Sequence, residues 1–363
     1  MAQESQHILV GNLIPDAQTG PIGSRYITIE NGKIVSITPP PFTIDNDVIN
    51  LSDKTVMPGM IDLHVHLTGD PGGDFWKRAT EPTEWGVVVG AKNARITALA
   101  GFTTVREAGS SQYSAFSLRR GTAEGKIPGP RIVAAGPPLA IVGGHGDTTG
   151  FTEEINEELA SGYSCTGTVE CAEKVRKASR AGADIIKITA TGGVLSQQGR
   201  GLEAHFTNME MKSIADTAHS LGLKVMAHAH GARGIEAAAR AGIDSIEHGT
   251  YLDKAAADAM KALENAKKAA EAAKKAMEAK KKRSSVNKEA AIQEVTKEPM
   301  KRLNVNIAES KLKQFKGKAA TALEPRHQLL ELGWVVHDTI VLFEIRSLGR
   351  RQAREQRVEV KFA

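Results

Sequence analysis

The chain has 363 residues, an apolar share of 41% and 35 glycines, a composition typical of a globular, loop-rich α/β protein and not of a disordered one. No apolar run approaches the roughly twenty residues that a membrane helix needs, and the first residues are too polar for a secretory signal. The net charge of +5 hides an asymmetry, because residues 1–252 hold 22 Lys and Arg against 27 Asp and Glu, whereas residues 253–363 hold 25 against 15. Two parts of opposite charge indicate two origins or two tasks.

The two cysteines, Cys165 and Cys171, form neither a CxxC pair nor a disulfide framework. We therefore expect two reduced thiols. With no signal peptide and no membrane span in the pattern, the sequence predicts a soluble cytoplasmic protein without a membrane partner.

The N-terminal segment shows short alternating strands separated by turns, ILVGNLI, SRYITIENGKIVSITP and DVINLSDKTV. Asn31-Gly32 lies between two alternating runs and predicts a hairpin turn. We expect residues 1–57 to form a small β-sandwich.

The stretch MPGMIDLHVHL, residues 57–67, predicts a strand that opens after Pro58-Gly59, with Met60, Ile61, Leu63 and Val65 buried. Residues two apart in a strand face the same way, so the side chains of its two histidines, His64 and His66, can reach one divalent cation, with Asp62 below them. Alone, an HxH pair is ambiguous, since most such pairs are ordinary polar residues.

Strand and helix patterns then alternate, and glycines mark where helices end and strands begin. The strands are expected at Gly101–Arg106, Arg131–Ala135, Ala183–Thr189, Lys224–His228 and Ile243–His248, and the clearest helices at Glu84–Ala100, Val169–Ala181 and Thr207–Leu221. Repeated β-α units predict a parallel sheet in a barrel or a doubly wound fold. With the strand before His64 included, residues 58–253 hold six strands.

Polar residues gather at the ends of these strands: His64 and His66, Lys187, His228 and His248. In a (β/α) barrel the carboxyl ends of all strands meet at one mouth, so this set predicts a metal site. Lys187 lies between isoleucines and is costly to bury charged, so we expect it to be neutral or carboxylated. The alternative is an ordinary ion pair between Lys187 and Asp184 or Glu107.

Together the motifs MPGMIDLHVHL, GFTTVREAG, GGHGD, ADIIKITATGGVLS and KVMAHAHGARGIEAAARAGIDSIEHGTYLD resemble the amidohydrolase superfamily. The similar branch is that of the imidazolonepropionase-related dipeptidases, which cleave Xaa-Pro and similar dipeptides. The resemblance covers roughly residues 6–255 and implies a (β/α) barrel enzyme that hydrolyses a C–N bond of a small peptide or cyclic amide.

The resemblance also implies a ligand set. His64 and His66 would hold one zinc ion, His228 and His248 a second, and carboxylated Lys187 would bridge them, with a metal-bound hydroxide attacking the amide. By the same resemblance His145 and His230 would face the substrate, although a hydrogen bond that positions a loop explains either histidine equally well. The pair Gly192-Gly193 would let the backbone approach the ligand closely.

The family pattern further requires a seventh strand, an eighth ending in an aspartate, and a C-terminal return of strands to the sandwich. None is recognisable here, so the sequence predicts a barrel truncated after strand six. Residues 254–283, rich in Ala and Lys, predict a solvated spacer helix followed by a linker at Arg283–Ser285.

The basic region of residues 284–363 has no single pattern. Glu298–Ala320 resembles the opening of a ribbon-helix-helix DNA-binding domain, in which Lys301, Asn304 and Asn306 would contact bases. The later stretch GWVVHDTIVLFEI favours a strand, and its Asp338 is a poor substitute for the missing aspartate.

Three hypotheses follow: a zinc amidohydrolase, a chain whose basic third binds nucleic acid, and a truncated or chimeric product without turnover. Unpaired strand edges also favour a homo-oligomer.

Overall fold

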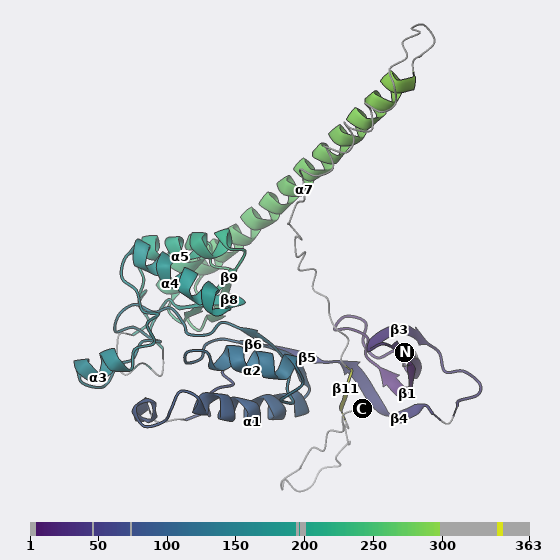
Figure 1. Cartoon of the computed structure of the whole chain (residues 1–363), viewed down its shortest axis with the longest axis horizontal. Coiled ribbons are helices and arrows are strands. Elements are labelled where there is room, and N and C mark those ends of the chain that lie inside the picture. The colour runs from purple at the N-terminus through teal and green to yellow at the C-terminus, as the bar shows by residue number, and fades with distance from the viewer. Residues whose placement is uncertain are drawn as a thin grey trace, which may run out of the picture. The chain divides into compact units, whose positions relative to one another are not determined.

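The computed structural model describes residues 5–45, 47–72, 75–193, 196, 201–297 and 340–343. Contacts divide the chain into two compact units, Met1–Leu263 with His337–Ala363, and Glu264–Val336. The first unit holds an N-terminal sheet and a series of parallel strands with their helices (Figure 1).

The N-terminal sheet has five strands in the order β11-β4-β1-β2-β3. They are β1 Ser5–Leu13, β2 Arg25–Glu30, β3 Lys33–Thr38, β4 Ile49–Pro58 and β11 Ile340–Phe343. The described residues here form one sheet and not the two facing sheets predicted. A small core of its own lies on this sheet, made by Ile8, Val10, Leu13, Ile27 and Val56.

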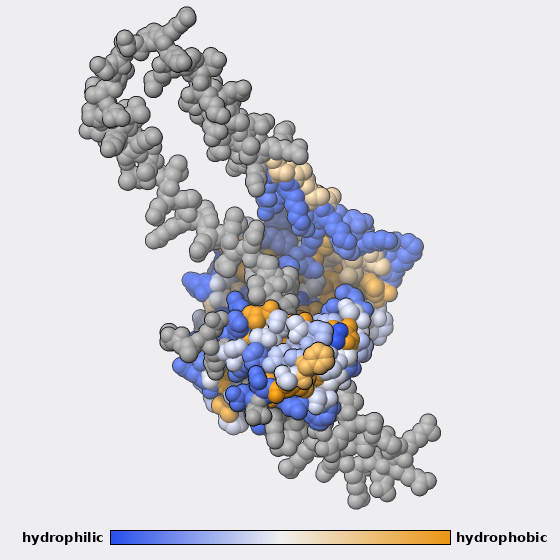
Figure 2. All heavy atoms as spheres, turned by 90° about the vertical axis from the view of Figure 1, so that its right-hand side faces the viewer, coloured by the Kyte–Doolittle hydropathy of each residue, from blue (hydrophilic) through white to orange (hydrophobic). Residues whose placement is uncertain are grey.

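The predicted hairpin is confirmed. β2 and β3 pair antiparallel, and the two residues between them, Asn31 and Gly32, have φ values of 52° and 73°, as a tight hairpin turn requires. The outer strand β3 leaves Val35 and Ile37 exposed. On this side of the molecule hydrophobic residues are scattered among hydrophilic ones (Figure 2).

A C-terminal strand does return to this sheet, contrary to the expectation that none would. β11 lies within the stretch predicted as a strand and pairs antiparallel with β4, so that Ile340 faces Pro58 and Phe343 faces Thr55. The four apolar residues of β11 suit this position because they are bulky or β-branched.

The next part of the chain contains six parallel strands in two three-stranded sheets, β5-β6-β7 and β8-β9-β10. The strands are β5 Met60–Val65, β6 Phe102–Glu107, β7 Arg131–Ala134, β8 Ile185–Thr189, β9 Lys224–Ala229 and β10 Ser245–His248. The intervening helices are η1 Phe75–Ala79, α1 Trp85–Leu99, α2 Ser114–Ala123, α3 Glu153–Glu158, α4 Thr168–Ala181, α5 Asn208–Ser220 and α6 Ala232–Ala241. The alternation and all six strands were predicted, and the three helix ranges that were predicted correspond to α1, α4 and α5.

Leu139 joins the two sheets. It forms a parallel bridge with Ile188, its N–H donates to the carbonyl of Lys187 at 2.8 Å, and its carbonyl accepts from the N–H of Thr189 at 3.0 Å. The six strands therefore follow one another in chain order around a shared core. That core includes fully buried side chains from strands and helices alike, such as Leu118, Ile186, Ile188, Met211 and Ile214.

The prediction that the four apolar residues of β5 are buried is wrong, since Met60 and Val65 are only half-buried and the other two are exposed. Ile61 is 53% exposed and Leu63 is 55% exposed. β5 pairs with β6 on one side, and among the described residues no strand pairs with its other side. Alternating apolar residues are buried only where a neighbouring element covers the face of the strand on which they lie. None of the described elements covers the face of β5 that carries Ile61 and Leu63.

After β10 the chain forms a single helix, α7 Lys254–Lys297. The predicted linker at residues 283–285 is therefore wrong, because no glycine or proline interrupts the helix-forming sequence before Pro299. Ala256 and Ala259 pack into the core, while residues 264–279 are all exposed, as expected of a solvated helix. None of the helices in the described part of the chain is both long and apolar enough to cross a membrane.

The expectation of two reduced thiols is also wrong, since Cys165 and Cys171 form a disulfide. Both are fully buried, Cys165 before α4 and Cys171 within its first turn. A separation of six residues carries no sequence signature of pairing. Disulfides persist mainly in oxidising compartments, so the thiols no longer support the predicted cytoplasmic location. That location stays a prediction.

The segment that resembles a ribbon-helix-helix opening, with Lys301, Asn304 and Asn306, lies outside the described residues, as does Asp338. The nucleic-acid and homo-oligomer hypotheses therefore stay predictions.

Candidate metal centre

Six histidines predicted from the sequence lie together at the carboxyl ends of the strands. His64 lies in β5 and His66 directly after it. His228 lies in β9 and His230 directly after it, His248 ends β10, and His145 lies in the loop after β7. Each ring lies against the next, with centroid distances of 5.2 Å for His64–His66, 4.8 Å for His64–His248, 4.7 Å for His228–His248, 4.6 Å for His228–His230 and 4.2 Å for His145–His228. Parallel strands explain this gathering, because their carboxyl ends share one edge.

In the described part of the chain, His228, His230 and His248 form a candidate ligand group whose ligand atoms all lie within 4.8 Å of one another. The resemblance implied that His230 contacts the substrate. Its position in this group also allows it to bind the metal. His248 has a backbone φ of 70° and is followed by Gly249 with a φ of 60°. This left-handed turn ends β10 beside the other histidines of the candidate metal centre.

Hydrogen bonds to backbone carbonyls fix which ring nitrogen of two histidines is free. Nδ1 of His66 donates to the carbonyl of Gly109 at 2.9 Å, and Nε2 of His228 donates to the carbonyl of Gly192 at 3.2 Å. A carbonyl only accepts, so the other nitrogen of each ring carries a lone pair. A ring oriented in this way is what a metal ligand requires.

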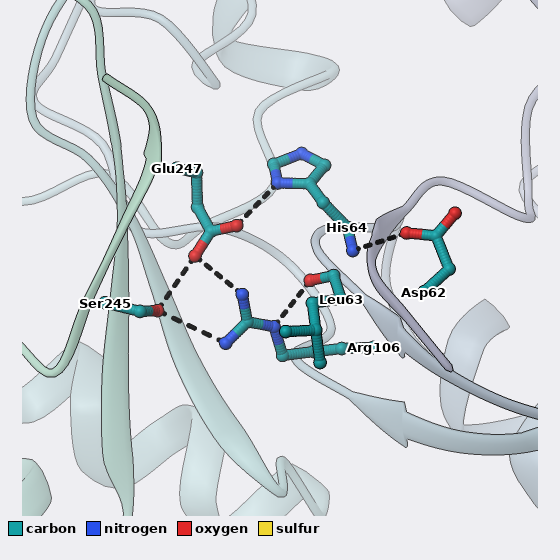
Figure 3. A network of polar contacts seen from close by, with 6 residues as sticks. All are labelled: Asp62, Leu63, His64, Arg106, Ser245 and Glu247. Atoms are coloured by element: carbon teal, nitrogen blue, oxygen red, sulfur yellow. Dashed lines mark hydrogen bonds and ion pairs between the residues drawn. The ribbon is translucent and has the colours of Figure 1, made fainter. Parts of the chain in front are cut away.

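His64 is held by a side chain instead. Its Nδ1 lies 2.8 Å from Oε2 of Glu247, whose Oε1 accepts from Nη2 of Arg106 at 2.7 Å and from Oγ of Ser245 at 2.8 Å (Figure 3). Burial acts to raise the pKa of Glu247, but the hydrogen bonds from His64 and Ser245 and the charge of Arg106 together hold that pKa below its ordinary value. Glu247 is therefore a carboxylate despite being only 6% exposed.

Five histidines of the cluster have lowered pKa values, which favours their uncharged form at neutral pH. Burial is the main cause that lowers the pKa of His228 to about 2 and the pKa values of His145 and His248 to about 4, and neighbouring histidines and Lys187 lower them further. Burial also lowers the pKa values of His66 and His230. Neutral imidazoles offer lone pairs, which is the form that binds a metal.

Lys187 lies fully within β8 and is 3% exposed. Burial lowers its pKa to about 8, against the opposing charges of Glu247 and Glu107. Its alternative partner Asp184 instead binds the guanidinium of Arg119 and the N–H of Ala134. The other alternative, Glu107, remains an electrostatic neighbour of Lys187.

Glu107 is a second buried acid that sequence reasoning did not assign to the site. It is completely buried, its Oε2 accepts from the N–H of Gly109 at 3.2 Å, and its Oε1 has no hydrogen-bond partner among the described residues. Burial raises its pKa to about 8. Neutral imidazoles, a buried amine and an unsatisfied carboxyl oxygen form a donor set that fits a divalent ion such as zinc.

The predicted substrate histidines both make the hydrogen bonds that the alternative explanation required. Nδ1 of His145 lies 3.0 Å from Oγ of Ser196, and Nδ1 of His230 lies 2.8 Å from Oγ1 of Thr250. Both rings also contact His228. Loop positioning and substrate contact are thus compatible for each.

The glycine pair allows close packing within the site, and its predicted approach to a ligand stays a prediction. A Cβ at Gly193 would lie 2.8 Å from the ring of His228 and 3.0 Å from that of His145, and a Cβ at Gly192 would lie 2.1 Å from the carbonyl oxygen of Gly201. Gly193 therefore lets the loop pack on the histidine rings, and Gly192 lets it pack on the backbone of Gly201.

Comparison with known proteins places this geometry in a family. The model of the amidohydrolase family matches residues 55–324. The ochratoxinase of Aspergillus niger is 31% identical over 280 residues, covering 70% of this chain and 56% of that protein. The crystal structure of a Xaa-Pro dipeptidase with methionine bound in its active site is 35% identical with a TM-score of 0.65, covering 72% of this chain and 65% of that one.

The crystal structure of the A. niger ochratoxinase gives a TM-score of 0.62 at 25% identity, over 72% of this chain and 64% of that one. The chain thus spans between about half and two thirds of the length of these relatives. Since the family model matches well over half of the chain, the chain belongs to the amidohydrolase family.

Proposed function

We propose that this chain is a metal-dependent hydrolase that cleaves the C–N bond of a small peptide, such as a Xaa-Pro dipeptide, or of a cyclic amide. The observation that carries the proposal is the cluster of six histidine rings beside the buried Lys187. The similarity to a Xaa-Pro dipeptidase and to an ochratoxinase supports this substrate class.

In this proposal His64, His66, His228 and His248 would hold zinc, together with Lys187 as a carbamate. The free nitrogens of His66 and His228 support these assignments. With a pKa of about 8, Lys187 has a neutral fraction near neutral pH, and only a neutral amine adds carbon dioxide. Bound zinc would supply the acidity that activates water and polarises the scissile carbonyl.

Two further histidines of the chain can contact the substrate. His145 and His230 are neutral rings whose Nδ1 atoms are held by Ser196 and Thr250, so their Nε2 atoms can contact the peptide. The aspartate that would carry the proton to the leaving amine has no counterpart at the end of a seventh or eighth strand in the described residues. Metal binding and turnover are therefore separate parts of the proposal, and the experiment must measure both.

The test is zinc content per chain by elemental mass spectrometry, followed by hydrolysis of a panel of Xaa-Pro dipeptides. We expect about two zinc ions per chain, fewer in His64→Ala, and an unchanged content in His7→Ala. His7 is a suitable control because it lies on β1 in the N-terminal sheet, where it bonds Thr28. A folded chain that retains no zinc would refute the metal site, and zinc without hydrolysis would refute the enzyme.

A further inference from the structure

We propose that Glu247 is a positioning residue that holds His64 as its Nδ1–H tautomer, which leaves Nε2 free to bind the metal. The inference rests on the proposed function for its purpose, although the tautomer itself is a property of the metal-free chain. His66 and His228 achieve the same result through backbone carbonyls, whereas His64 depends on a side chain 183 residues away.

The two carboxylate oxygens of Glu247 bind different partners, and this supports the positioning role. Oε1 is occupied by Arg106 at 2.7 Å and Ser245 at 2.8 Å. Oε2 is left for Nδ1 of His64, at 2.8 Å. A carboxylate has no proton to give, so the proton between Oε2 and the ring must come from Nδ1.

Arg106 fixes the direction in which the carboxylate points (Figure 3). Arg106 also donates from Nε to the carbonyl of Leu63 at 2.6 Å, the residue before His64. Its guanidinium thus binds the backbone of β5 and the carboxylate on β10 at the same time. Glu247 is 6% exposed and the side chain of Arg106 17% exposed, so water competes little for either.

A purely structural role is the competing explanation, because the same contacts connect β5, β6 and β10. The variant Glu247→Gln separates the two explanations. Glutamine keeps an oxygen for Arg106 and Ser245, and so preserves that connection, but it presents an NH₂ group to His64. The NH₂ group donates to Nδ1 and moves the ring proton to Nε2, the nitrogen that the metal needs.

The experiment combines two measurements on the full-length protein. Long-range ¹H–¹⁵N spectra of the metal-free protein with ¹⁵N-labelled histidine report the tautomer of His64, assigned by its loss in His64→Ala. Zinc affinity is measured by competition with a chromophoric chelator. The matched control is Ser245→Ala, which removes one hydrogen bond from Oε1 and leaves the contact between Oε2 and His64 in place.

We expect Nδ1–H in the unmodified protein and in Ser245→Ala, and Nε2–H in Glu247→Gln. Zinc affinity should fall about 10- to 100-fold in Glu247→Gln and change little in Ser245→Ala. An Nε2–H tautomer in the unmodified protein, an unchanged tautomer in Glu247→Gln, or an equal loss of affinity in Ser245→Ala would each overturn the proposal. A protein that binds no zinc refutes the proposed function, while the spectra still decide the role of Glu247.

Discussion

Replacing Glu107 by glutamine should change how the stability of the metal-free protein depends on pH. Glu107 is completely buried with one carboxyl oxygen unsatisfied, and burial raises its pKa from 4.5 to about 8. Between these two values the unfolded chain loses the proton of Glu107 while the folded chain keeps it. The folded state then binds more protons, so the free energy of unfolding falls as pH rises.

The size of the effect follows from the two pKa values. Ionisation of Glu107 in the unfolded chain lowers the free energy of unfolding by about 1.4 kcal/mol at pH 5.5 and by about 4.4 kcal/mol at pH 8. Each pH unit between the two pKa values contributes about 1.36 kcal/mol. Glu107 therefore removes about 3 kcal/mol of stability between pH 5.5 and pH 8. Glutamine retains the oxygen that accepts from Gly109 and has no proton to lose, so Glu107→Gln should lack this decline.

The assay is urea unfolding of the EDTA-treated protein and of Glu107→Gln at pH 5.5 and at pH 8. The lowered pKa values of the buried histidines act in both proteins, and the lowered pKa of Lys187 acts mainly above pH 8. Because Glu107 raises the pKa of Lys187, Glu107→Gln lowers that pKa further, and this change makes stability rise with pH and so widens the difference between the two proteins. Glu157 is exposed and supplies the control. The free energy of unfolding of Glu157→Gln should fall between pH 5.5 and pH 8 by as much as that of the unmodified protein. Equal declines in the unmodified protein and Glu107→Gln would show that Glu107 is ionised in the folded state and would refute the reasoning.

Two further predictions concern stability alone. Ile186→Ala should cost about 2–5 kcal/mol in urea unfolding, because Ile186 is fully buried, whereas Ile61→Ala, at a half-exposed position, should cost less than about 1 kcal/mol; equal costs would mean that β5 is covered. Replacing both Cys165 and Cys171 by alanine should cost about 2 kcal/mol, the chain-entropy value for so short a loop, and dithiothreitol should destabilise only the unmodified protein.

Features determined by neighbouring residues were predictable from the sequence. The turn at Asn31-Gly32 needs two residues that tolerate positive φ, and these two do. The glycines that end α4 and α6, Gly182 and Gly242, adopt the left-handed conformation that stops a helix. The histidines could be grouped because the parallel β-α repeat fixes where strand ends meet.

Features determined by tertiary contacts were missed. Glu247 stands beside His248 in the sequence, yet its partners Arg106 and His64 belong to strands more than 100 residues earlier, and no local pattern marks them. The exposure of Ile61 and Leu63 depends on which elements cover β5. The pairing of Cys165 with Cys171 depends on the approach of a loop to α4. Each of these requires tertiary structure and not periodicity.

The left-handed end of β10 affects how sequence variation at this position should be interpreted. His248 at a φ of 70° and Gly249 at a φ of 60° occupy a region of backbone space that glycine enters freely and that asparagine, aspartate and histidine enter more readily than other residues. An alignment of relatives would therefore show restricted variation at both positions even if no metal were bound. His248→Asn separates the two constraints, since asparagine keeps the tolerance for this backbone and removes the imidazole.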